Sequence, residues 1–114
     1  MTIHQARALM PRYLLAVTGL ATSQESSLAR RLAWVVDQVV VFGEHDYPED
    51  LRPKIDEMMR LLAGPQVPVG IERHPEYALT VPASYLHPAQ AKRVADIIVE
   101  VFESIVWTLH HGED

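Results

Sequence analysis

The adjacent residues His45 and Asp46 have the side-chain types that catalysis by a metal-bound water requires. They follow an apolar stretch that ends at Phe42, where we expect a helix to give way to a loop. An imidazole and a carboxylate can together hold a divalent cation, which lowers the pKa of a bound water and generates a nucleophile.

The pair resembles the histidine–aspartate dipeptide of the HD-type metal phosphohydrolases. Those proteins are all-helical, and their metal site takes another histidine upstream and an aspartate downstream. For this chain the resemblance implies His4 and Asp96 at these two positions. The resemblance implies a metal-dependent hydrolase centred on His45 and Asp46. A structural interpretation stands beside it, because residues 43–50 have the polar composition of a loop between helices. Asp46 would then cap the third helix.

Other patterns of catalytic or cofactor-binding residues are missing from the sequence. The chain has no cysteine, which excludes disulfides, thiolate metal ligands and thiol nucleophiles. No glutamate has a histidine three residues later, as di-metal carboxylate bundles require. There is neither a Gly-x-Ser-x-Gly elbow nor a glycine-rich phosphate loop. We therefore predict that the protein is not an enzyme and has no cofactor.

Size and composition narrow the class of protein. The 114 residues suffice for one domain, and 48% hydrophobic with 22% charged residues is typical of globular proteins. The formal net charge of −5 disfavours nonspecific binding to nucleic acid and suits a basic partner. The apolar runs are too short to cross a bilayer, and the N-terminus lacks the pattern of a secretory signal. We expect a cytoplasmic protein without a membrane partner.

Apolar residues recur at helical spacing in four segments. This periodicity predicts a mainly α protein, a bundle of about four helices in which residues 1–114 form a single domain. The first helix begins near Ile3. Pro11 predicts a kink or a division into two short helices, and Gly19 predicts the end of the segment.

Proline, glycine and capping residues set the expected bounds of the later helices. These bounds are Thr22 or Ser23 to Gly43, Pro48 or Pro53 to Ala63, and Pro88 to His111 with Gly112 as the cap. A strand over residues 39–42 is the alternative for the end of the second helix, because valine is a poor helix former. Between Gln66 and Tyr85 the apolar residues alternate, which predicts a short β-hairpin or an extended loop before the long C-terminal helix.

Two tryptophans fall on the polar sides of their predicted helices. Trp107 shares a face of the last helix with Glu100 and Glu103, and Trp34 lies among polar residues with Val41 two turns further on. Exposed tryptophans are enriched at the centres of interfaces, so we predict that all five residues contact a partner chain. The alternative is that both indoles are buried between helices of their own domain, as most large aromatics are.

Together these features predict a small cytoplasmic protein–protein interaction module. It would bind a macromolecular partner as inhibitors, immunity proteins, antitoxins and chaperones do, and it could form a homodimer. The partner is therefore another protein or a second copy of the chain, and nucleic acid is not expected. The HD-like hydrolase centred on His45 and Asp46 is the alternative function.

Overall fold

The computed structural model describes residues 1–63, 83 and 86–112 of the chain. Within these ranges the backbone forms helices and no strand. The elements are α1 (Ile3–Thr22), α2 (Leu28–Val39), η1 (Glu44–Asp46), η2 (Glu49–Leu51), α3 (Arg52–Ala63) and α5 (Pro88–His111), where η denotes a short 3-10 helix. The predicted helical bundle is confirmed. The predicted hairpin between residues 66 and 85 lies, apart from Ala83, outside the described residues.

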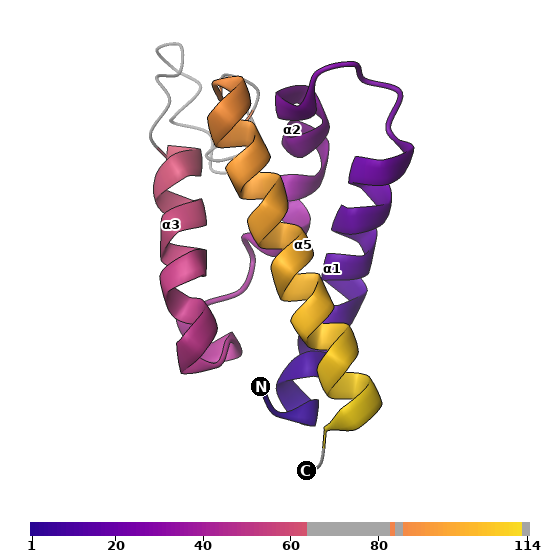
Figure 1. Cartoon of the computed structure of the whole chain (residues 1–114), viewed down its shortest axis with the longest axis vertical. Helices are drawn as coiled ribbons and strands as arrows, with labels where there is room; N and C mark the ends of the chain where they lie inside the picture. The colour runs from indigo at the N-terminus through magenta and orange to yellow at the C-terminus, as the bar shows by residue number, and fades with distance from the viewer. Residues whose placement is uncertain (64–82, 84–85, 113–114) are drawn as a thin grey trace.

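The long helix α5 runs through the middle of the bundle (Figure 1). Helix α1 packs against both α5 and α2, and α3 packs against α5. α1 and α5 run in opposite directions, so the start of α1 and the end of α5 lie at the same end of the molecule. The largest fully buried side chains come from all four helices and the loop before α3: Leu9, Tyr13, Leu32, Val36, Val39, Tyr47, Met58, Leu62, Val94, Ile97, Ile98 and Ile105. None of the described helices is both long and apolar enough to cross a membrane.

Helix α1 continues through Pro11 as one element, so the predicted division into two helices is wrong. A capping box starts it: the Gln5 amide donates to Thr2 Oγ1 and the Thr2 amide donates to Gln5 Oε1, both at 3.0 Å. Proline lacks the amide that would bond to the carbonyl of Arg7. Both Pro11 and Arg7 are exposed, so water can satisfy that carbonyl.

Gly19 does not end α1, contrary to the prediction, because the helix runs on to Thr22. Its role is to let α2 approach closely. A Cβ atom at position 19 would come within 2.5 Å of Val35 Cγ1 on α2. The absence of a side chain therefore permits the close contact between α1 and α2.

Helix α2 starts later than predicted. Ser27 is its cap and accepts from the Arg30 amide at 3.5 Å, so Ser23 and Glu25 lie before the helix. The helix ends at Val39 and the next residues form a turn, which excludes a strand over residues 39–42. Burial against the rest of the bundle outweighs the low helix propensity of the valines.

Helices α3 and α5 end at the residues that the sequence predicts. Helix α5 also begins at its predicted residue. His87 caps α5: its Nδ1 accepts from the Ala89 amide at 3.4 Å, and its own amide donates to Gln90 Oε1 at 3.3 Å. Pro88 is the first helical residue, and Gly112 closes the C-terminus. His87 thus serves to start the longest helix.

A buried aromatic cluster attaches the loop after α2 to α1. The rings of Tyr13, Phe42 and Tyr47 have centroids 6.2 to 6.3 Å apart. The hydroxyls of Tyr13 and Tyr47 form a buried hydrogen bond of 2.7 Å. Burial raises the pKa of the Tyr13 phenol far above its usual value, and it raises the pKa of Tyr47 to about 12. Both phenols are therefore neutral at ordinary pH.

Candidate protein-binding surface

Both tryptophans are on the surface of the molecule. Trp34 is 72% exposed and Trp107 is 63% exposed, and Val41 is 56% exposed. The alternative interpretation, in which the indoles are buried between helices of their own domain, is therefore wrong for this chain. Helical periodicity alone placed both side chains on the outer faces of α2 and α5.

Trp107 lines an open hollow of about 510 Å³ beside the C-terminal half of α5. The opposite side of the hollow is formed by η2 and the first turn of α3. Its lining residues are Met1, Pro48, Asp50, Leu51, Lys54, Glu100, Glu103, Ser104, Trp107 and Thr108. Three of the five predicted contact residues, Glu100, Glu103 and Trp107, thus come together at one place. We call this feature the Trp107 hollow.

The outer face of the same helix end carries a second, more apolar hollow of about 390 Å³. It is lined by Phe102, Glu103, Val106, Trp107, His110 and His111. The Trp107 indole lies beside the His111 ring, with the centroids 5.1 Å apart. Trp107 and Glu103 therefore border both hollows.

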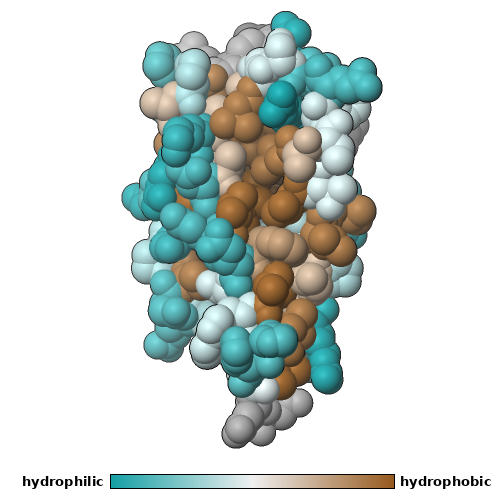
Figure 2. All heavy atoms as spheres, turned by 45° about the vertical axis from the view of Figure 1, so that its right-hand side comes forward, coloured by the Kyte–Doolittle hydropathy of each residue, from teal (hydrophilic) through white to brown (hydrophobic). Residues whose placement is uncertain are grey.

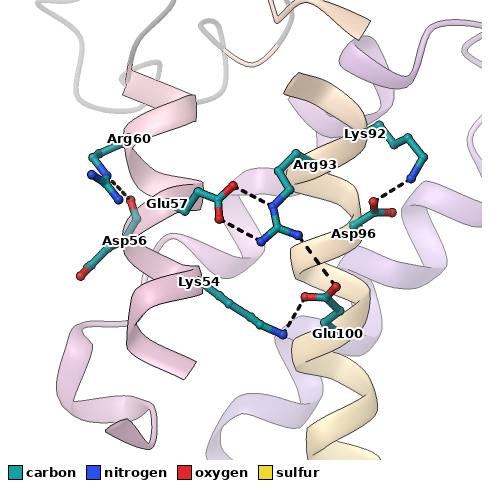
Figure 3. Close-up of polar contacts among 8 residues, drawn as sticks. All are labelled: Lys54, Asp56, Glu57, Arg60, Lys92, Arg93, Asp96 and Glu100. Carbon is teal, nitrogen blue, oxygen red and sulfur yellow. Dashed lines mark hydrogen bonds and ion pairs between the residues drawn. The ribbon is translucent and has the colours of Figure 1, made fainter. Parts of the chain in front are cut away.

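Glu100 is held inside the molecule's own network of ion pairs (Figure 3). Its Oε2 atom is buried and lies 2.9 Å from Lys54 Nζ, and its Oε1 atom lies 3.9 Å from Arg93 Nη1. Arg93 also donates two hydrogen bonds to Glu57 on α3. These bonds lower the pKa of the Glu57 carboxyl and raise the pKa of the Arg93 guanidinium. Glu100 therefore joins α3 to α5, whereas Glu103 is exposed.

Trp34 and Val41 belong to a different surface, on the outer side of α2. No residue of α2 lines the Trp107 hollow. The neighbouring part of α1 is joined to α2 by a hydrogen bond from Arg12 Nη1 to Gln38 Oε1 at 3.4 Å. The five predicted contact residues consequently form two separate groups.

The residues that the sequence analysis missed are those that reach the Trp107 hollow from outside α5. Asp50 and Lys54 lie about half the chain away from Trp107 in sequence, and no spacing rule connects them. Only the packing of α3 against α5 brings them together.

The proposed metal ligands are not gathered into a site within the described residues. His45 is exposed in η1, and Asp46 Oδ2 accepts a hydrogen bond of 2.7 Å from the amide of Gly43. Asp46 therefore stabilises its own loop and does not cap α3, contrary to the structural interpretation of the sequence. Among residues 1–63, 83 and 86–112, no three histidine, aspartate or glutamate side chains are placed to hold one metal ion. His4 and Asp96 thus do not complete a site with His45 and Asp46.

Comparison with known protein families, with curated proteins and with solved structures found no match.

Proposed function

We propose that this protein is a small interaction module that acts by binding another protein chain, in the manner of inhibitors, immunity proteins, antitoxins and chaperones. The observation that carries the proposal is the exposure of Trp107, at 63%, beside a hollow that can receive a partner side chain. Covering the exposed part of one indole, roughly 100–150 Å² at about 25 cal/mol per Å², contributes on the order of 3 kcal/mol. That is a large share of the free energy of a moderate protein–protein contact.

The chemistry of the Trp107 hollow favours a basic side chain from the partner. Glu103 and Asp50 are exposed carboxylates in its lining, whereas the charge of Lys54 is compensated by Glu100. An arginine or lysine that enters the hollow would face these carboxylates and could stack on the indole of Trp107. The net charge of −5 adds long-range attraction for a basic partner.

The α2 surface is proposed as a second contact. Trp34 and Val41 are both exposed there and lie two turns apart on α2 and the turn that follows it. Aromatic anchors dominate interface energies, so each tryptophan can act as the centre of its own contact. The proposal places the module in the cytoplasm, and it includes neither catalysis nor a cofactor.

The proposal is tested by affinity purification of the tagged chain from its own host, followed by quantification of the proteins that copurify. We expect a specific partner with the wild type and at least about tenfold less of it with Trp107→Ala, the equivalent of about 1.4 kcal/mol. Leu15→Ala is the matched control, because Leu15 is 58% exposed and does not line the hollow. Equal recovery with Trp107→Ala and the wild type would contradict the proposal.

A stability measurement separates binding from folding in this experiment. Because Trp107 is exposed, Trp107→Ala should keep the helical circular dichroism and the melting temperature of the wild type. A melting temperature lowered by several degrees would show instead that the indole serves the fold.

A further inference from the structure

A band of apolar side chains follows the long axis of the molecule on the face shared by α1 and α5 (Figure 2). Its members include four large side chains that are at least 37% exposed, namely Leu14, Val99, Val106 and Leu109. Met10, Val17 and Phe102 are half-buried members that also pack against the core. We call this feature the α1–α5 band. It is distinct from the Trp107 hollow, whose lining contains none of these seven residues.

The spacing of the band is that of a helix that packs against another helix. On α5, the residues Ala95, Val99, Phe102, Val106 and Leu109 are separated by four, three, four and three positions. A parallel row on the same helix, Ala91, Val94, Ile98, Val101 and Ile105, is buried in the core of the bundle. Helix α5 thus carries two adjacent rows of this type. Its own core covers one of them, and the other stays at the surface.

Helix α1 contributes a matching row. Met10, Leu14 and Val17 follow the same spacing of four and three. The two helices are antiparallel, and Gly112 at the end of α5 lies against Ile3 at the start of α1. Counted back from that contact, Leu14 is about level with Phe102, and Met10 is about level with Val106. The two rows therefore form one surface about 21 Å long, at 1.5 Å per residue from position 95 to 109.

The charges beside the band identify its occupant. The charged side chains of α1 are Arg7 and Arg12, and Arg12 binds Gln38 on the α2 side, so Arg7 supplies the basic charge at this edge of the surface. On the α5 side, Asp96 is paired with Lys92 at 2.7 Å, and Glu103 is exposed. Within the described part of the chain, neither Arg7 nor Glu103 takes part in an ion pair. One edge of the band is thus basic and the other is acidic.

We propose that the α1–α5 band is the contact surface between two copies of this chain. A two-fold axis parallel to the helices places α1 of one copy against α5 of the other, and it does so twice, as a symmetric dimer requires. The facing helices are then antiparallel, with rows spaced for side-by-side packing as in a four-helix bundle. The same rotation puts Arg7 of each copy at the same edge of the contact as Glu103 of the other, about six residues or roughly 9 Å apart along the axis. A basic and an acidic edge on one surface are what a second copy of that surface complements.

The test is sedimentation equilibrium of the full-length chain over a range of concentrations. We expect a dimer for the wild type. Val99→Glu and Leu14→Glu place a charge in the band from α5 and α1 respectively, and each should raise the dimer dissociation constant at least about a hundredfold because a buried carboxylate lacks a partner. Leu15→Glu is the control at an exposed leucine outside the two rows, and it should leave the dimer intact. A wild type that stays monomeric at hundreds of micromolar would overturn the proposal, as would dimers of unchanged strength in both band variants.

Charge exchange tests the orientation of the two copies. Arg7→Glu and Glu103→Arg should each weaken the dimer by a few-fold at low salt, since each replaces two attractions between exposed charges at one edge with two repulsions. The double variant should return to about the wild-type dissociation constant. A double variant weaker than both single variants would contradict the proposed two-fold arrangement.

Glu103 serves both the dimer and the proposed partner binding, whereas Trp107 and Val99 each belong to one of them and separate the two. Trp107→Ala should change the dissociation constant of the dimer much less than Val99→Glu does, because Trp107 belongs to neither row, although it borders Phe102 and Val106 in the second hollow. Circular dichroism that matches the wild type in Val99→Glu and Leu14→Glu shows that a monomer results from the lost contact and not from unfolding.

Discussion

Arg93 on α5 donates two hydrogen bonds to the carboxylate of Glu57 on α3, from Nε to Oε2 at 2.7 Å and from Nη2 to Oε1 at 2.8 Å (Figure 3). This bidentate arrangement fixes the orientation of the two groups as well as their distance. Further along α5, Glu100 forms an ion pair with Lys54 on α3, and its Oε2 atom lies 2.9 Å from Lys54 Nζ. The two links hold the first half of α3 beside α5, and the Trp107 hollow lies at the end of that contact.

Replacing Arg93 with lysine should lower the melting temperature by a small amount. Lysine keeps the charge but cannot make the bidentate contact to Glu57. Both side chains are more than one-third exposed, so solvent screens the pair and the loss is modest. Thermal unfolding by circular dichroism should show a smaller difference between variant and wild type at about 1 M salt, where the Debye length is about 3 Å. A difference that does not depend on salt would contradict this account of the pair.

Removing one hydroxyl from the Tyr13–Tyr47 pair should destabilise the protein. Tyr47→Phe leaves the buried hydroxyl of Tyr13 without the partner it has at 2.7 Å, which costs about 1–3 kcal/mol. The double variant with Tyr13→Phe leaves no buried hydroxyl there, so its loss should be smaller than the sum of the two single losses. Urea unfolding measures all four proteins, and strictly additive losses would argue against the hydrogen bond.

The same two tyrosines predict a loss of stability in alkali. Their pKa values are raised in the folded state, that of Tyr47 to about 12, whereas an unfolded tyrosine titrates near its ordinary value of 10.0. Above about pH 10 the unfolded chain releases these protons and the folded chain keeps them, so the free energy of unfolding falls as pH rises. Unfolding by urea at pH 8, 10 and 11 should show this decline in the wild type. The double phenylalanine variant should show a weaker one.

Gly19→Ala should destabilise the protein although alanine favours helix. The gain in helix propensity is about 1 kcal/mol, and overpacking a tight contact costs about 1–3 kcal/mol. At position 19 the added Cβ would lie 2.5 Å from Val35 Cγ1 on a buried side chain, so the clash should prevail. Gly43→Ala is the control, because the atom nearest to its added Cβ is 3.9 Å away and the free energy of unfolding should hardly change. A more stable Gly19→Ala protein would show that α1 and α2 can separate without cost.

The ends of α3 and α5 and the start of α5 were predictable because proline and glycine leave the backbone few alternatives, whereas α3 begins at Arg52, directly after η2, where the sequence left Pro48 and Pro53 as alternatives. Pro88 fits the first position of a helix, and a helix such as α5 readily ends before Gly112. The bounds of α1 and α2 were not predictable in the same way. Residues 22–27 contain several side chains that can cap a helix, and the choice of Ser27 over Ser23 depends on packing. Gly19 resembles a helix end in the sequence, but its function is the contact with Val35.

The exposure of the tryptophans was predictable from the helical period, because that period assigns each residue a direction. The composition of the Trp107 hollow was not, since Asp50 and Lys54 reach it through the tertiary contact of α3 with α5. The α1–α5 band was hidden for another reason. Apolar residues such as Phe102 and Leu109 follow the core row so closely on α5 that the sequence alone merges two rows into one.

The central claim is that the protein works by binding another chain through the surface around Trp107. Native mass spectrometry of the tagged protein, purified gently from its own host beside its Trp107→Ala variant, tests it most directly. We expect a complex whose mass exceeds that of the 12.9 kDa chain or its dimer by the mass of a second protein. In the variant this complex should be lost, while the chain itself stays folded. A wild-type spectrum that contains only the chain, with bound divalent metal ions that disappear in His45→Ala, would contradict the claim and favour the hydrolase.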